Sequence, residues 1–285
     1  MPRPLDQPPK AVFVLLGFAL AACGLTQADE PTQQPPSEQA TVLPAAAQPR
    51  LGERLDFHGR WMGIPVGYGW IEVKGIVLLN GRRAIHIEAQ GHTNDVLSTF
   101  YPIHDIVHSY LDAETLQPLQ FEKSQREGHY RADEIVMFDH EHALATYHSR
   151  LNGSVKTINL PDAFQDLIST FYWFRSQPLR SGASLELNIY SDEKIYATEI
   201  QVSQPTMLEL LKRGTFPCLV VEPKASFKGL LVKRGRIWAY LSADEHRLPL
   251  LVKATTPWGA MSAVIDQDSI PPTLRRARRH SRAAR

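Results

Sequence analysis

Cysteine is scarce in this chain of 285 residues, which contains only Cys23 and Cys218. Two thiols cannot build a disulfide framework or a four-thiolate zinc site. Long apolar runs are also missing, because the apolar stretch Ala11–Ala22 has twelve residues and is too short to span a bilayer stably. With 43% hydrophobic and 21% charged residues, the composition is that of a globular protein and excludes a multi-span membrane protein.

Motifs of the common catalytic classes are missing as well. The sequence contains no Gly-x-Ser-x-Gly nucleophile elbow, no phosphate-binding glycine loop and no His-Glu-x-x-His zinc motif. Cys218 stands between Pro217 and the apolar run Leu219–Val221, which favours a buried small side chain over a reactive thiol. The sequence therefore predicts no catalytic residue, no resident metal and no cofactor.

The first 22 residues have the pattern of a lipoprotein signal peptide. Arg3 and Lys10 precede the apolar stretch, which ends in Leu20-Ala21-Ala22-Cys23 and resembles the bacterial lipobox. The resemblance implies cleavage before Cys23 and acylation of that residue, which anchors the chain in a membrane. In lipoproteins, Asp at the position after the acylated Cys retains the protein in the inner membrane. This chain has Gly24 at that position, which favours the outer membrane. A plain secretory signal cut near Ala28 is the alternative.

Residues 23–50 then form a predicted tether. Gly24–Arg50 contain five prolines and five glutamines but no aromatic residue, so they lack the apolar surface that offsets chain entropy. We expect this segment to be disordered.

The charges of the chain are unevenly distributed, although the net charge is only +1. Residues 1–22 carry +1 and residues 270–285 carry +6, which leaves −6 for the part between them. We expect residues 270–285 to be a basic, disordered tail, because runs of like charge repel and remain solvated. Nucleic acid is excluded as a partner of an exported protein, so anionic lipids or polymers of the envelope are the expected contacts.

Residues 51–269 are predicted to form one β-rich domain. Alternating patterns separated by turn residues at intervals of about 8–12 predict a single antiparallel curled sheet or a barrel-like domain. Asn80-Gly81 is a strong hairpin signal. Apolar residues at helical spacing predict one covering helix over 163–175, with Asp162 as its N-cap. The predicted strands are Trp70–Lys74, Ala84–Ala89, Val107–Leu111, Leu119–Gln125, His129–Phe138, Ala143–Leu151, Ser154–Asn159, Leu185–Tyr190, Lys194–Val202, Cys218–Pro223, Arg236–Leu241, Pro249–Ala254 and Gly259–Ile265.

A short internal echo accompanies this pattern. Asp95–Tyr101 (DVLSTFY) resembles Asp166–Tyr172 (DLISTFY). Two copies do not establish a repeat array, and both coincidence and duplication of a β-unit remain open.

Several short motifs in a fixed order resemble the bacterial envelope family known as domain of unknown function 3108. They include Phe121–Arg131, Asp166–Arg175 and Gly214–Cys218, followed by Ile237-Trp238 and Arg247–Pro249, and the resemblance covers roughly Leu55 to Ile265. It implies a secreted or lipid-anchored, β-rich protein without an established activity. No catalytic residue can be carried over from it.

Two groups of residues are candidates for ligand binding. Arg126, Tyr130 and Arg131 surround the expected hairpin tip Glu127-Gly128, where a guanidinium can bind a phosphate or a carboxylate. The alternative for the arginines, which we favour, is a structural role in cross-strand ion pairs with Glu122 or Asp133. The second group is Tyr172, Trp173 and Arg175 on the predicted helix, which either fill the core or line an apolar cavity.

Histidines and acids give weaker signals. His140 and His142 have strand-like spacing beside Asp139, and His104 and His108 lie four residues apart, but solvent exposure explains these pairs better than metal binding. The available acids for a hydrolase of envelope glycans or lipids are Asp139, Asp166, Asp244 and Glu245.

Together these patterns predict a non-enzymatic, periplasm-facing outer-membrane lipoprotein that binds an apolar or anionic envelope component or assists envelope assembly. A hydrolase and a structural protein-interaction module are the alternatives.

Overall fold

The computed structural model of the protein describes residues 48–211, 213–223, 236–256, 259–272 and 274. These residues form fifteen strands and two helices, so the predicted mainly β class is confirmed. The first seven strands and the short first helix are β1 (Arg54–Trp61), β2 (Ile64–Leu79), β3 (Arg82–Thr93), α1 (Asp95–Ser98), β4 (His104–Asp112), β5 (Pro118–Glu127), β6 (Tyr130–Asp139) and β7 (Leu144–Ser149). The remaining elements are β8 (Val155–Asn159), α2 (Leu167–Ser176), β9 (Ser184–Ser191), β10 (Lys194–Val202), β11 (Thr206–Leu210), β12 (Gly214–Pro223), β13 (Arg236–Ser242), β14 (Pro249–Thr256) and β15 (Gly259–Ile265).

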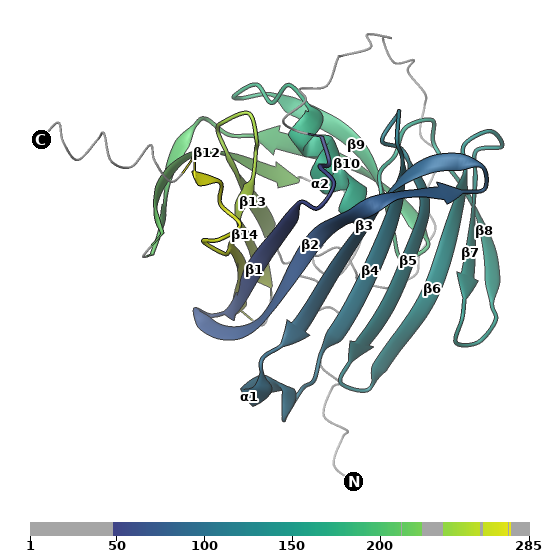
Figure 1. Cartoon of the computed structure of the whole chain (residues 1–285), viewed down its shortest axis with the longest axis horizontal. Coiled ribbons are helices and arrows are strands. Elements are labelled where there is room, and N and C mark those ends of the chain that lie inside the picture. Colours follow the sequence, from purple (N-terminus) through teal and green to yellow (C-terminus); the bar gives the residue numbers. More distant parts are fainter. Residues whose placement is uncertain (1–47, 212, 224–235, 257–258, 273, 275–285) are drawn as a thin grey trace, which may run out of the picture.

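The strands form one antiparallel sheet that curls but does not close. Its order is β8-β7-β6-β5-β4-β3-β2-β1-β15-β14-β13-β12-β10-β9, with β11 paired to β12, so β8 and β9 are the ends of the hydrogen-bonded order in the described chain. Figure 1 shows the two halves of the sheet on either side of α2. Tyr190 of β9 packs its ring on Phe138 of β6 at 5.2 Å between centroids, so the last strand lies against the inner face of the first half.

The chain turns where the sequence predicts it to turn. Asn80 and Gly81 join β2 to β3 with φ angles of 48° and 82°, the left-handed pair that a type I′ hairpin requires. The turn Gly128-His129 joins β5 to β6, one residue later than the predicted tip.

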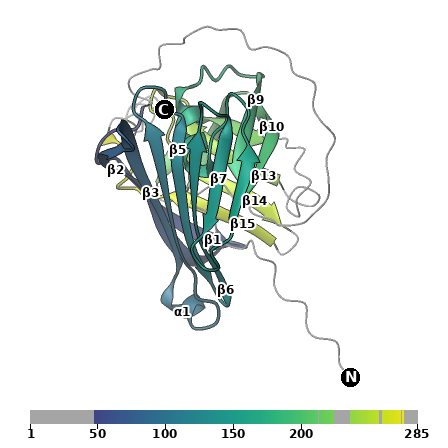
Figure 2. The ribbon, with the colours of Figure 1, turned by 90° about the vertical axis from the view of Figure 1, so that its right-hand side faces the viewer.

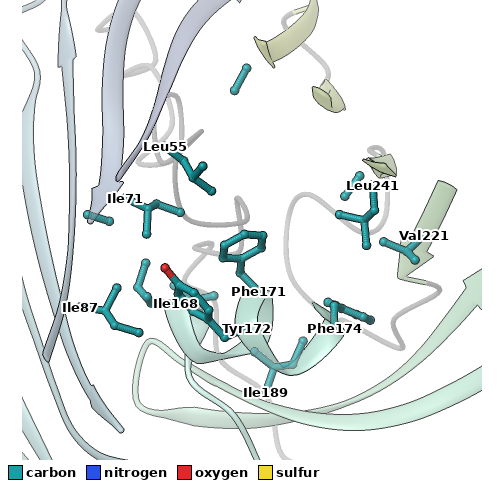
Figure 3. Close-up of a cluster of buried hydrophobic side chains, with 14 of the residues drawn as sticks. Leu55, Ile71, Ile87, Ile168, Phe171, Tyr172, Phe174, Ile189, Val221 and Leu241 are labelled. Atoms are coloured by element: carbon teal, nitrogen blue, oxygen red, sulfur yellow. The ribbon is translucent and has the colours of Figure 1, made fainter. Parts of the chain in front are cut away.

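Helix α2 is buried on nearly all sides rather than covering one end of the sheet. Nine of its ten residues are buried, all except Trp173. Figure 3 shows Ile168 and Tyr172 close to the β1–β3 side chains Leu55, Ile71 and Ile87, while Phe174 points toward Val221 of β12. A helix that is buried around nearly its whole circumference is a core element, and the two facing halves of the sheet supply the surrounding core.

The predicted N-terminus of this helix is wrong by four residues. The N-cap is Asp166 and not Asp162: its carboxylate accepts hydrogen bonds from the backbone of Ile168 and Ser169, each at 2.8 Å, and from Ser109 Oγ at 2.6 Å. Residues before it are extended, because Gln165 forms a parallel bridge with Ile189 of β9. Asp162 lacks these tertiary partners.

We expect Asp166→Ala to lower the free energy of unfolding by about 2 kcal/mol, because it removes the cap and leaves the hydroxyl of Ser109 and two backbone N–H groups unsatisfied in the core. Asp166→Asn keeps a capping acceptor and should cost clearly less. Urea unfolding followed by tryptophan fluorescence measures both, and equal losses for the two variants would contradict the capping role.

The folded part extends beyond the predicted domain end at residue 269. Ile270 is buried in the core, and the partly buried Leu274 packs against that core. The sequence analysis predicted that both residues belong to the basic tail. The predicted signal peptide 1–22, the lipidation site Cys23, most of the tether 23–50 and the arginines of the tail lie outside the described residues. None of the described helices is long and apolar enough to cross a membrane.

Candidate functional site

The three predicted ligand residues on α2 are parts of the core. Tyr172 and Arg175 are each 1% exposed, and Trp173 is half-buried and packs edge-on against Phe174. The guanidinium of Arg175 forms a bidentate ion pair with Glu53, with both N–O distances 2.9 Å, and its Nε donates to the carbonyl of His246 at 3.1 Å. These groups tie α2 to the chain before β1 and to the β13–β14 turn.

The interior beside α2 is filled. An apolar pocket there has a cavity volume of about 10 Å³, room for one water molecule and far less than an acyl chain needs. Its lining comes from α2 and from the inner faces of β9, β10 and β12: Leu167, Thr170, Phe174, Ile189, Ile200, Val221 and Pro223. The aromatic residues of α2 therefore form a packed core at this place.

The β5–β6 hairpin brings Arg126 and Arg131 together on an exposed surface. They are directly opposite each other in the register of the two strands, and both side chains are exposed. Arg131 Nη1 donates to the carbonyls of Gly128 and Tyr130 at 2.8 and 2.7 Å.

The predicted ion pairs of these arginines are wrong. Glu122 and Asp133 instead pair with Arg150, with N–O distances of 2.7 and 3.6 Å. No salt bridge joins Arg126 or Arg131 to a carboxylate of the described chain. Arg150 takes both acids because it lies at the end of β7, level with Asp133 of β6, whose carbonyl accepts its backbone N–H.

Two buried carboxyl groups lie behind this hairpin. Asp105 of β4 and Glu127 of β5 are both buried, and each carboxyl group shifts the pKa of the other. Asp105 Oδ1 accepts from the backbone N–H of Arg126 at 3.0 Å, and Glu127 Oε1 accepts from Gln125 Nε2 at 3.3 Å. Burial and the neighbouring carboxylate of Asp105 raise the pKa of Glu127 to about 8, and burial raises the pKa of Asp105 as well.

A buried lysine continues this polar interior. Lys123 of β5 pairs with Glu134 of β6 at 2.7 Å and with Asp192 of the β9–β10 turn at 2.8 Å. Burial alone would lower the pKa of Lys123, but the two carboxylates outweigh it and hold the pKa above its usual value. The ammonium therefore stays charged and links the two halves of the curled sheet.

The histidine pairs considered for metal binding do not lie together in the structure. His140 and His142 lie in the turn after β6 rather than in a strand: His140 Nε2 donates to the carbonyl of Pro118 at 2.7 Å, while His142 pairs with Asp139 at 2.8 Å. His108 faces His86 across β3 and β4, with 3.0 Å between Nδ1 and Nε2. Within the described ranges, no three His, Cys, Asp or Glu side chains are placed to share a metal ion.

The acids considered for hydrolysis do not form a common site. Asp139 binds the turn after β6, Asp166 caps α2, and Asp244 accepts from Ser242 Oγ at 2.5 Å in the β13–β14 turn. Glu245 is exposed in the same turn. Cys218 is buried, and burial raises the pKa of its thiol, so it resembles a core residue as expected.

Comparison with known families adds to this geometry. Residues 56–266 match the family described as "Protein of unknown function (DUF3108)". The chain belongs to the DUF3108 family. The matched region includes α2, the arginine hairpin and the buried carboxyl pair of this DUF3108 chain.

Among solved structures, the DUF3108 chain is similar to the beta-barrel-like protein of domain of unknown function DUF1849 from Brucella abortus. The TM-score is 0.52 at 7% sequence identity, over 76% of this chain and 96% of that one. At such low identity the likeness shows the fold alone, and it supports the barrel-like architecture. No curated protein matches the chain.

Sequence reasoning missed the Asp105–Glu127 pair. A signal was available, because Lys123, Gln125 and Glu127 share the strand parity of the core residues Leu119 and Phe121. Three polar side chains in succession on the inner face of a strand indicate a buried polar network.

Proposed function

We propose that this DUF3108 protein is a non-enzymatic lipoprotein of the outer membrane that faces the periplasm and binds an anionic envelope component at the β5–β6 hairpin. The observation that carries the proposal is the facing pair Arg126 and Arg131, exposed and without a carboxylate partner in the described chain. The lipobox pattern around Cys23 and the tether sequence support the anchored location.

Two arginines at directly opposite positions are unfavourable for the sheet itself. Like charges in a cross-strand pair are destabilising, and the acids Glu122 and Asp133, which would relieve the repulsion, are engaged by Arg150. A phosphate or carboxylate between the two guanidinium groups would remove the repulsion and accept several charge-assisted hydrogen bonds. An anionic ligand therefore fits this surface better than an apolar one.

The packed interior also favours binding at the outside of the sheet. The core beside α2 has room for one water molecule at most, so an acyl ligand has no space there. Three of the four carboxyls named for the hydrolase alternative have separate partners, namely Asp139, Asp166 and Asp244, and Glu245 is exposed. Both observations favour a binding protein over a hydrolase.

The binding proposal is tested with pyrophosphate and with deacylated lipopolysaccharide as probes, using the full chain at several salt concentrations. We expect Arg126→Gln combined with Arg131→Gln to weaken binding about tenfold or more, because each arginine near an anion contributes on the order of 1 kcal/mol. The matched control is Arg82→Gln with Arg83→Gln, which removes two adjacent exposed arginines at the β2–β3 hairpin. Equal affinities for both double variants would refute the site.

The anchored location has its own test. Metabolic labelling with a radioactive fatty acid should label the wild-type chain and not Cys23→Ser, and fractionation should place the labelled protein in the outer membrane. A soluble, unlabelled product beginning near Ala28 would instead support the plain secretory signal.

A further inference from the structure

Three turns meet at the end of the sheet that carries α1. They are the β1–β2 turn, the β3–β4 connection and the β5–β6 turn. Asn94 joins the first two, because its Nδ2 donates to the carbonyl of Pro65 and its backbone N–H to that of Val66, both at 2.9 Å. The backbone N–H of Gly128 donates to Pro102 at 2.8 Å and joins the last two. We define the α1 end by the residues Arg60–Ile64, Asn94–Pro102 and Arg126–Arg131.

The α1 end projects from the molecule and is held together tightly. Figure 2 shows α1 at the tip of the long strands, beyond the rest of the described sheet. A Cβ atom on Gly128 would lie 2.6 Å from the ring of Tyr101, so the β5–β6 turn packs directly on the β3–β4 connection. The three turns therefore present one continuous surface.

Large apolar side chains are exposed across this surface. Phe100 is 81% exposed and Val96 is 75% exposed in the β3–β4 connection, where α1 itself has no buried residue. The β1–β2 turn adds Trp61, Met62 and Ile64, the last two more than 60% exposed. An exposed apolar patch of this kind marks an interaction surface.

The charges of the α1 end are mainly positive. Arg60, Arg126 and Arg131 are its cations, and Asp95 is its exposed carboxylate. Glu127 belongs to the same segments but is buried, and burial raises the pKa of its carboxyl group. The guanidinium of Arg60 donates to the carbonyl of Gly63 at 3.2 Å, so all three arginines lie at turns beside the apolar side chains.

We propose that the α1 end docks on an anionic lipid bilayer, with Phe100, Val96 and the β1–β2 turn in the interface and the three arginines on lipid phosphates. This proposal rests on the proposed anion-binding role of Arg126 and Arg131 and names the partner of that site. Aromatic and aliphatic tips flanked by arginines are the composition of interfacial segments, in which buried apolar area and attraction to anionic headgroups add. The surface presents separate projecting apolar side chains. A fluid lipid interface can surround each of them, whereas a rigid protein partner must offer a matching pocket for each.

The length of chain between Cys23 and β1 allows the α1 end to face the membrane in which Cys23 would be anchored. Gly52 donates its backbone N–H to Val73, so the described chain enters β1 at the end away from Trp61. The eight residues of β1 cover about 26 Å. The 25 Cα–Cα steps from Cys23 to Gln48 can reach at most about 85 Å, so a lipid on Cys23 permits the α1 end to touch the same membrane.

The test places a polarity-sensitive fluorophore at Phe100→Cys or, as the matched control, at Leu78→Cys of the β2–β3 hairpin, which is 73% exposed. Both full-length chains carry Cys23→Ser, and Cys218 is buried. The vesicles are phosphatidylcholine alone or with phosphatidylglycerol. We expect a blue shift at position 100 with the anionic vesicles and none at position 78. The leader and the basic tail are common to all samples, so the label reports the α1 end.

Charge variants complete the test. Arg126→Gln with Arg131→Gln should raise the lipid concentration needed for the half-maximal shift about tenfold, whereas Arg82→Gln with Arg83→Gln should leave it unchanged. Vesicle binding without a shift at position 100, an equal shift at position 78, or a shift that requires another envelope protein would each overturn the proposal. If the probe pyrophosphate still binds through Arg126 and Arg131 in any of these cases, the proposed anion site stands without the membrane contact.

Discussion

Replacing Arg175 with alanine is expected to lower the free energy of unfolding by about 3–5 kcal/mol. The guanidinium is 1% exposed, pairs with Glu53 through two nitrogens, and donates to the carbonyl of His246. Its planar group also packs over the rings of Phe171 and Tyr172, at 5.3 and 5.4 Å from their centroids. Removal leaves the part-buried carboxylate of Glu53 and a carbonyl without their donors, together with a cavity at the buried site of the guanidinium.

Urea unfolding of the full chain, followed by tryptophan fluorescence, measures this loss. Arg180→Ala is the matched control, because that side chain is exposed after α2 and its removal should change stability by less than about 0.5 kcal/mol. Glu53→Gln keeps the packing and one acceptor, so it should cost less than Arg175→Ala. A loss below about 1 kcal/mol for Arg175→Ala would show that the ion pair does not hold α2 in place.

Glu127→Gln is expected to make the protein more stable at pH 8, by as much as about 4 kcal/mol. The pKa of Glu127 is raised to about 8 from 4.5, mainly by burial and then by Asp105, against the smaller opposing effect of Lys123. The folded state therefore holds a proton between these two pH values that the unfolded state has released. Stability should fall as the pH rises from about 4.5 to 8, by at most about 1.4 kcal/mol per pH unit, and then level off.

Glutamine removes this slope because it is uncharged at every pH, whereas the buried carboxyl of Glu127 is uncharged only below a pH of about 8. Unfolding free energies from pH 5 to 9 for the wild type and for Glu127→Gln test the expectation, with the exposed turn variant Glu141→Gln as control. A wild-type profile that is flat over this range, or a slope that survives in Glu127→Gln, would contradict the raised pKa of Glu127.

Much of the sheet could be predicted, because strand identity depends on local alternation and turn residues. Asn80-Gly81 determines its hairpin through the left-handed φ angles that few other residues adopt. The start of α2 could not be predicted in the same way, since Asp162 and Asp166 both precede an apolar helical pattern. Asp166 became the cap because Ser109, 57 positions earlier in the chain, lies beside it in the fold.

The candidate site could likewise be predicted only in part from the sequence. The sequence identified Arg126 and Arg131 as anion-binding residues, but it paired them with the wrong acids, because the end of β7 brings Arg150 to Glu122 and Asp133. Asp105 and Glu127 are 22 positions apart, and only the pairing of β4 with β5 makes them neighbours. Contacts between residues far apart in the sequence produce little signal in the local spacing of residue types.

The two echoed segments show what the sequence by itself determined about this protein. DVLSTFY and DLISTFY both enter a helical turn, because local backbone preference and capping chemistry depend on nearby residues. The sequence likewise determined the β class, the hairpins, the separation of charge between the body and the tail, and the family.

Only the tertiary structure decided which of the two segments is exposed and which is buried. Phe100 is 81% exposed at the projecting α1 end, whereas Phe171 is 2% exposed between the two halves of the sheet. Burial depends on which other elements surround a side chain, and this follows from the curl of the whole sheet. The same few residues thus became a candidate membrane contact in one place and the centre of the hydrophobic core in the other.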